Sequence, residues 1–172
     1  MPDDARPSVL VIMGVSGCGK SSFGRALAVR LGWPFQEGDD LHPPANVAKM
    51  SAGCPLDDDD RAPWLDAVRR WAADRLSAGV SGVITCSALK RDYRDRLRAA
   101  GAGLRFVYLE GGPELIASRL AARPGHFMPA SLLASQFAAL EPPVTEADVA
   151  PIAINLPLAR QVDIAIAMMG RV

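Results

Sequence analysis

A glycine-rich loop near the N-terminus constrains the fold of this chain more than any other feature. Residues 14–21 read Gly-Val-Ser-Gly-Cys-Gly-Lys-Ser and fit the pattern G-x-x-x-x-G-K-[ST]. The loop follows a short apolar run, residues 8–13, and precedes a helix-like stretch, residues 21–31. Glycines allow successive backbone N–H groups to turn inward onto phosphate oxygens. The order strand, loop, helix therefore predicts a site for nucleotide phosphates.

Two side chains of this loop carry the expected chemistry. Lys20 is expected to reach the β- and γ-phosphates of ATP, and the Ser21 hydroxyl is expected to ligate magnesium. Ser21 also stands at a helix N-terminus, which favours anions. The residues expected to bind ATP here are Gly14, Val15, Ser16, Gly17, Cys18, Gly19, Lys20, Ser21 and Ser22.

Motifs that the sequence lacks narrow the class of phosphate-binding protein. No Asn-Lys-x-Asp or Asp-x-x-Gly occurs, so guanine recognition and a GTPase switch are not expected. The third strand candidate ends in Cys86 and Ser87, where many ATPases carry an acid that orients magnesium. Another carboxylate must then serve, and Asp39, at the end of the second strand candidate, is the leading candidate.

Strand and helix patterns alternate along the whole chain. The strand candidates are residues 8–13, 33–37, 83–86, 104–109 and 152–154. The helix candidates are residues 21–31, 44–52, 60–78, 90–100, 113–122 and 130–140, with a last helix that ends near Met169. This alternation predicts an α/β fold with a mostly parallel sheet covered on both faces. We expect one domain, residues 1–172, with an exposed loop over residues 141–151.

Composition and charge exclude several classes of function. The chain has 172 residues, of which 19 are basic and 19 acidic, so the formal net charge is zero. A balanced charge gives no reason to expect duplex nucleic acid or an anionic membrane as a partner. No apolar run approaches the roughly 18 residues of a membrane span. Three cysteines without a Cys-x-x-Cys pair indicate reduced thiols, and we expect a cytoplasmic protein.

Two blocks of sequence resemble one family of small-molecule kinases. The first, residues 38–65, begins GDDLHP, and the second, residues 86–98, begins CSALK. With shorter matches at residues 119–127 and 135–141, they resemble the bacterial-type gluconokinases. The resemblance implies transfer of the γ-phosphoryl group of ATP to the 6-hydroxyl of D-gluconate, with Mg²⁺ as cofactor. It also implies a three-layer P-loop kinase fold, strand order 2-3-1-4-5, and a homodimer.

The resemblance and the residue chemistry together give candidates for the acceptor site. Asp39 is expected either to accept the hydroxyl proton or to orient hydrated magnesium, and the sequence leaves both roles open. The acceptor carboxylate also needs cations, and arginine suits two parallel hydrogen bonds. The cationic candidates are Lys49, Arg61, Lys90, Arg91 and Arg94. The resemblance adds Ser87 and Gln136, and it adds His42 and His126 for either substrate contact or loop hydrogen bonding.

Arg119 and Arg123 stand four residues apart and so share one face of a helix. An anion between them relieves their mutual repulsion. By the resemblance, Arg119 lies by the adenine and phosphates, and Arg123 opens a lid, residues 123–131, that closes on ATP and excludes water. Lys20, Asp39 and Arg123 are thus the expected catalytic residues.

Other conspicuous residues are expected to be structural. The acidic run at residues 57–60 lacks the ligand spacing of a calcium loop and is expected to cap the following helix. Trp64 and Trp71, seven residues apart, are expected to pack in the core. Cys86 is expected to be a buried thiol without a catalytic role.

Two other functions fit the phosphate loop. One is a different small kinase that acts on shikimate or a nucleoside monophosphate, and the other is a nucleotide-binding module that has lost catalysis. For the preferred function, eight of the 19 basic residues are expected to serve one cleft. The acids are then expected to lie largely elsewhere, so that a positive pocket opens in a comparatively acidic surface.

Overall fold

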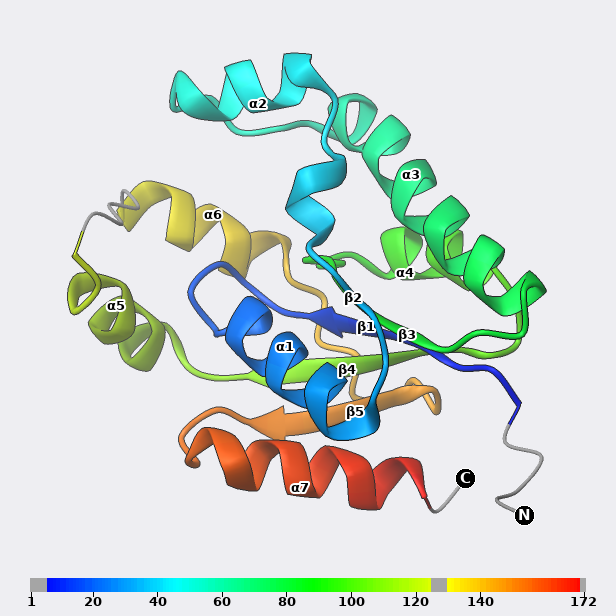
Figure 1. Ribbon diagram of the computed structural model, residues 1–172. Coiled ribbons are helices and arrows are strands. Elements are labelled where there is room, and N and C mark those ends of the chain that lie inside the picture. Colours follow the sequence, from blue (N-terminus) through cyan, green and yellow to red (C-terminus); the bar gives the residue numbers. More distant parts are fainter. Residues whose placement is uncertain (1–5, 125–129, 171–172) are drawn as a thin grey trace.

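The computed structural model describes residues 6–124 and 130–170. Its centre is a five-stranded sheet in the order β2-β3-β1-β4-β5 with every neighbouring pair parallel, which confirms the expected topology (Figure 1). The strands are β1 (Val9–Met13), β2 (Phe35–Gln36), β3 (Gly82–Thr85), β4 (Leu104–Glu110) and β5 (Val149–Ala153). The carboxyl ends of β1, β2 and β3 therefore lie side by side at one edge.

Helices cover both faces of the sheet. They are α1 (Lys20–Leu31), α2 (Pro44–Ser51), α3 (Asp58–Ser77), α4 (Arg91–Arg98), α5 (Pro113–Ala121), α6 (Ala130–Ala139) and α7 (Leu158–Met169). A short 3₁₀ helix, η1 (Gly38–Leu41), follows β2. In Figure 1, α3 and α4 lie on one side of the sheet, and α1 and α7 lie on the other. The three-layer architecture is thus confirmed.

The sheet has a hydrophobic core on each face, and the side chains of β1 point alternately into one and the other. Leu10 and Ile12 point to one face and pack with residues of α1 and α7, including Leu27. Val11 and Met13 point to the other face, where α3 and α4 pack. Since the strand is buried on both sides, it reads in the sequence as a continuous apolar run.

Among the element boundaries that differ from the sequence-based expectation, two change the setting of a proline. β5 begins at Val149, inside the stretch expected to be a loop, and it contains Pro151. An edge strand tolerates proline because one row of its backbone N–H groups has no strand to pair with. α3 begins at Asp58 instead of Asp60, which places Pro63 in the second turn of the helix instead of the first.

The acidic run caps α3 as expected. The Asp57 carboxylate accepts from the Asp60 backbone N–H at 2.8 Å, and the Asp60 carboxylate accepts from the Asp57 N–H at 3.0 Å. This reciprocal pair is a capping box, here built from two aspartates. Over the described ranges, no helix is both long and apolar enough to cross a membrane.

Candidate active site

The phosphate loop connects β1 to α1 at the carboxyl edge of the sheet. Gly14, Gly17 and Gly19 have φ angles of 142°, 82° and 97°, values that favour glycine. Lys20 donates from Nζ to the carbonyl oxygens of Gly14 at 2.9 Å and Val15 at 3.0 Å. Its ammonium group thus lies over the loop, where a nucleotide phosphate would bind.

The start of α1 is electrostatically suited to an anion. The helix begins at Lys20, its first turn contains no acidic residue, and Gly19 caps it in the left-handed conformation. The first N–H groups of a helix lack internal partners and carry partial positive charge. Ser21 is half-buried in this turn, Ser22 is exposed, and Cys18 is buried beneath the loop.

Asp39 is carried by η1, which hydrogen bonds hold against the end of β3 and against α3. The Gly38 N–H donates to Thr85 Oγ1 at 2.9 Å, and the Gly38 carbonyl accepts from Trp64 Nε1 at 2.8 Å. The Thr85 hydroxyl in turn donates to the Glu37 carboxylate. A Cβ at Gly38 would lie 1.7 Å from the Thr85 carbonyl oxygen, so only glycine fits here. The Asp39 side chain is 81% exposed on this fixed turn.

His42 lies directly beside Asp39. Its ring stacks on Trp64 with a centroid distance of 4.2 Å and an interplanar angle of 15°. Its Nε2 is 3.9 Å from Asp39 Oδ1. Burial lowers the pKa of His42 below its ordinary value, an effect that the nearby Asp39 carboxylate opposes and the Arg61 guanidinium reinforces.

The segment after β3 meets the phosphate loop through its backbone. The Ser87 carbonyl accepts from the Gly14 N–H at 3.2 Å. The next residue, Ala88, has a φ of 45°. Cys86 is buried, as expected, and its burial raises the pKa of the thiol to about 12. A raised pKa favours the protonated thiol near neutral pH, which agrees with the structural role expected for Cys86.

α6 reaches the phosphate loop from the far side of the cavity. Gln136 Oε1 accepts from the Ser16 backbone N–H at 2.6 Å, which joins residues 120 positions apart in the sequence. Gln136 therefore touches the loop that is expected to hold ATP, although the sequence placed it with the acceptor.

One cavity of about 350 Å³ brings most of these side chains together. Its lining includes seven of the predicted site residues, namely Ser16, Lys20, Asp39, His42, Arg61, Ser87 and Gln136. The rest of its lining is Met50, Cys54, Pro55, Leu56, Trp64, Leu132 and Ser135. The cavity therefore joins the phosphate loop to the segment between η1 and α3.

Lys49, Lys90 and Arg91 do not line this cavity, and each has acidic neighbours. Lys49 donates to the Asp60 carboxylate, a hydrogen bond that raises the pKa of Lys49 and lowers that of Asp60. Lys90 donates to Asp58 at 2.9 and 3.1 Å. The Arg91 side chain is 64% exposed and lies 3.9 Å from an acid on the next turn of α4.

Arg94 corrects the sequence-based expectation, because its side chain is fully buried and cannot meet a substrate. Its guanidinium makes a two-point contact with the Glu146 carboxylate at 3.0 and 2.6 Å. It also donates to the carbonyl oxygens of Ala88, Leu89 and Glu141 at 2.8, 3.1 and 3.0 Å. All the N–H groups of the Arg94 guanidinium therefore donate to partners inside the protein.

The two arginines expected near the nucleotide occupy different settings. Arg119, near the end of α5, is half-buried and donates to the Ile154 carbonyl after β5. Arg123 is exposed beyond the end of α5 at Ala121, so the expectation that it shares a helix face with Arg119 is wrong. Residues 125–129 of the expected lid, with His126 among them, lie outside the described residues.

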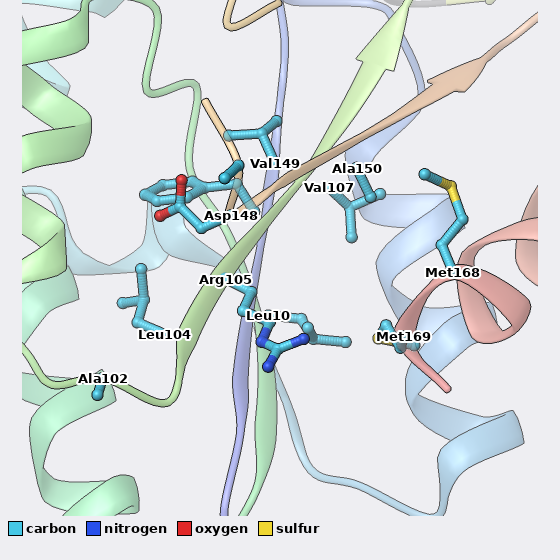
Figure 2. Close-up of a pocket in the computed structure, with 12 residues that line it drawn as sticks. Leu10, Ala102, Leu104, Arg105, Val107, Asp148, Val149, Ala150, Met168 and Met169 are labelled. Carbon is cyan, nitrogen blue, oxygen red and sulfur yellow. The ribbon is translucent and has the colours of Figure 1, made fainter. Parts of the chain in front are cut away.

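A second cavity, of about 330 Å³, lies far from this chemistry. Figure 2 shows it at the amino ends of β4 and β5 beside the last turn of α7, lined mainly by apolar side chains such as Val107 and Met168. Its acid, Asp148, already accepts from Arg98 at 2.7 and 2.8 Å. The carboxyl-edge cavity, with Lys20 and Asp39 in its lining, is therefore the candidate active site.

Sequence reasoning missed part of the cavity lining. Trp64 was expected only to pack; it is buried as expected, but its ring also faces the cavity. Leu132 and Ser135 also line it from α6, the helix that carries Gln136, but neither was among the predicted site residues. Asn46, in the first turn of α2, places its side-chain nitrogen 3.3 Å from Nδ1 of His42, a contact that no motif marks.

Comparison with known proteins agrees with this geometry. The AAA domain family matches residues 9–143, which include the phosphate loop and the acceptor segment. A solved gluconokinase from Sinorhizobium meliloti 1021 superposes with a TM-score of 0.88 at 49% identity, covering 96% of this chain and 93% of that one. The fold and the phosphate loop therefore define a P-loop kinase.

Relatives of similar sequence show to which family of P-loop kinases the chain belongs. A gluconokinase of Gluconobacter oxydans is 56% identical over 138 residues, which are 80% of this chain and 78% of that protein. The thermoresistant gluconokinase of Escherichia coli is 46% identical over 151 residues, 87% of this chain and 86% of that protein. The chain belongs to the gluconokinase family.

Proposed function

We propose that the protein phosphorylates D-gluconate, transferring the γ-phosphoryl group of ATP to the 6-hydroxyl to give 6-phosphogluconate and ADP. The observation that carries this proposal is the shared cavity, in which Lys20 of the phosphate loop and Asp39 and Arg61 of the acceptor segment meet. Membership of the gluconokinase family supports the choice of acceptor.

The nucleotide half of the proposed site uses the backbone of the phosphate loop. Its N–H groups and the start of α1 hold the phosphates, while Lys20 leaves the loop carbonyls and neutralises charge on the β- and γ-phosphates. Arg119 in the last turn of α5 and Arg123 just beyond that helix would add positive charge at the phosphates. Because transfer needs little covalent chemistry, position and charge supply most of the rate.

The residues present fit a magnesium ion bound mainly through the nucleotide. Mg²⁺ keeps several waters and takes one or two protein oxygens besides phosphates. The Ser21 hydroxyl in the first turn of α1 and the exposed Asp39 carboxylate supply such oxygens. Within the described ranges, no three acidic, histidine or cysteine side chains cluster as a separate metal site. When bound, the ion would draw charge from the transferring phosphoryl group.

The acceptor half of the proposed site recognises a small polyhydroxy acid. Arg61 is the one cation from α3 in the cavity lining, and we assign it to the gluconate carboxylate. Its Nε already donates to the Leu56 carbonyl at 3.3 Å, which leaves the terminal nitrogens to the ligand. Asp39 would then face the reacting hydroxyl, either as the base or through hydrated magnesium.

A panel of acceptors tests the proposal. Purified protein with ATP and magnesium should form ADP fastest with D-gluconate, and phosphate should appear on the 6-hydroxyl in the product. Shikimate, nucleoside monophosphates and other sugar acids serve as competing acceptors. Faster turnover on any of these would assign a different substrate, and ATP binding without turnover on any of them would indicate a non-catalytic module.

The assembly and location of the protein extend the same proposal. By its family resemblance, we propose a homodimer that acts in the cytoplasm. Sedimentation of the purified protein would test the first part, since a dimer has about twice the mass of the 18.2 kDa chain.

A further inference from the structure

Asn46 is a buried polar residue beside the cavity, and the proposed chemistry does not use it. It lies in α2 and is 4% exposed. Its side-chain nitrogen donates to the Asp60 backbone carbonyl at 2.8 Å. The same nitrogen lies 3.3 Å from Nδ1 of His42. One amide group thus connects α2 to the start of α3 and to the histidine next to η1.

The Asp60 carbonyl determines which way the amide of Asn46 points. A carbonyl oxygen can only accept a hydrogen bond, so the Asn46 atom that faces it must be the NH₂ group. That group has two hydrogens, and Nδ1 of His42, 3.3 Å from the nitrogen, is within hydrogen-bond distance of the second one. Since an NH₂ group donates, Nδ1 of His42 must accept with a lone pair.

The surroundings of His42 hold its ring in one orientation. Its side chain is only 4% exposed, and Trp64 stacks on one face at 4.2 Å. The charged groups that face the ring are Asp39 of η1 and Arg61 of α3. A neutral ring with a lone pair on Nδ1 carries its proton on Nε2, the nitrogen that lies 3.9 Å from Asp39.

We propose that Asn46 is a positioning residue that fixes His42 as the Nε2–H tautomer, so that the ring presents a hydrogen-bond donor next to Asp39 in the acceptor cavity. Such a donor selects an oxygen with a free lone pair, as in a hydroxyl or carboxylate group. The part of the inference that concerns the acceptor rests on the proposed function. The tautomer itself depends on the contacts of Asn46 with the Asp60 carbonyl and with the His42 ring.

Two-bond proton–nitrogen NMR reads the tautomer directly. The chain contains two histidines, so His126→Gln leaves His42 as the single imidazole in a nitrogen-15-labelled sample. At one fixed pH near neutrality, we expect a protonated Nε2 and an unprotonated Nδ1. A protonated Nδ1 with a bare Nε2, or two nitrogens averaged by exchange, would overturn the inference. This measurement leaves Asn46 unchanged and so does not depend on how well an Asn46 variant folds.

The substitution Asn46→Asp then tests whether Asn46 causes this state. The two side chains have nearly the same shape, but a carboxylate only accepts, so the ring proton should move from Nε2 to Nδ1 and the nitrogen pattern of His126→Gln should change. Val47→Asp is the matched control, because it adds the same charge one residue away at a position 48% exposed. The control should retain the original pattern. An unchanged pattern in folded Asn46→Asp protein would refute the role of Asn46.

Steady-state kinetics connect the tautomer to the acceptor. Loss of one oriented hydrogen bond in Asn46→Asp should raise the KM for gluconate by roughly tenfold, with the KM for ATP nearly unchanged. Val47→Asp should change neither value appreciably. Equal effects on both substrates would refute the link to the acceptor site. If the wild-type protein did not use gluconate at all, the proposed function would fail while the NMR result would still decide the tautomer.

Discussion

Lys20 has the most direct assignment of any single residue in the proposed site. Its ammonium donates to two carbonyls of its own loop, and we expect it to turn to the β- and γ-phosphates when ATP binds. Lys20→Ala should therefore lower kcat by about 10²–10³-fold, since it removes a preorganised charge from the transferring group. A coupled assay of ADP release measures kcat, and circular dichroism checks that the fold is intact.

Arg30→Ala is the control for that substitution. Arg30 is a cation at the other end of α1, where it pairs with Asp163 at 3.1 Å on the surface. Its removal should leave kcat within about twofold, because exposed ion pairs contribute little. Near-normal kcat in Lys20→Ala would remove this lysine from the catalytic machinery.

Asp39 and Asp40 provide a matched pair of neighbouring carboxylates. Both are exposed, but only Asp39 lines the cavity. Asp39→Asn should lower kcat by roughly 10²–10⁴-fold, whether the carboxylate accepts the proton or orients magnesium. Asp40→Asn removes the same charge from the next residue and should keep nearly full activity. Comparable losses in both variants would mean that the overall charge of η1 matters more than the position of Asp39.

At the scale of elements, the buried Arg94 ties α4 to the segment after β3 and to the loop before β5. Its carbonyl contacts include Ala88, whose φ of 45° is sparsely populated by residues other than glycine. Arg94→Met should lower the free energy of unfolding by about 3–5 kcal/mol, because the buried Glu146 carboxylate would lose its main partner. Urea denaturation measures this change.

The exposed pair Arg96–Asp66 is the control on the same helix. These side chains approach to 2.7 Å but are 42% and 34% exposed. Arg96→Met should change the free energy of unfolding by at most about 1 kcal/mol. If the two arginine variants lost equal stability, the burial of Arg94 would have no special role.

The same buried pair predicts how stability depends on pH. Hydrogen bonds from Arg94, reinforced by Arg98, lower the pKa of Glu146 from 4.5 to about 2. A carboxyl whose pKa falls on folding stabilises the protein fully above its unfolded pKa and ceases to do so as pH falls through its folded pKa. Stability should therefore decline between pH 4.5 and about 2. Urea midpoints over this range should fall more steeply for the wild-type protein than for Glu146→Gln, and parallel curves would contradict the assignment.

Local patterns in the sequence predict most of these elements but not the role of Arg94. The alternation of strands and helices is local, and so are the glycine loop and the cap of α3, which is why they could be read from the chain. Arg94 and Glu146 are 52 residues apart, and nothing local marks either as buried. Arg94 was therefore predicted to bind the acceptor together with the other cationic candidates. The early start of β5 was hidden for a similar reason, because its proline suggested a loop.

For the whole molecule, the acidic and basic residues that give the net charge of zero are distributed differently from the expectation. The prediction that the acids lie away from the site cations is wrong for several of them. Lys49 pairs with Asp60, and Lys90 pairs with Asp58. Acids and bases are thus interleaved around the cavity, and Lys20 and Arg61 are the predicted cations that line it. Neutrality here reflects local pairing as well as a balance between separate regions.

Nucleotide binding should stabilise the whole protein, since the phosphate loop is part of the central core. A ligand at about 100 times its dissociation constant adds roughly 2.7 kcal/mol to the free energy of unfolding. For a chain of this length, that corresponds to a rise in Tm of roughly 5–10 °C with MgATP, which differential scanning fluorimetry measures.

The α1 variants Lys20→Ala and Arg30→Ala distinguish specific MgATP binding from a general effect of salt or magnesium on Tm. At the same MgATP concentration, Arg30→Ala should keep the full rise in Tm because it lies at the far end of the helix. Lys20→Ala should lose most of the rise, because its dissociation constant for MgATP increases and the linked stabilisation falls with it. Equal rises in the two variants would show that the nucleotide stabilises the protein without the phosphate loop, and would move the ATP site away from the carboxyl edge of the sheet.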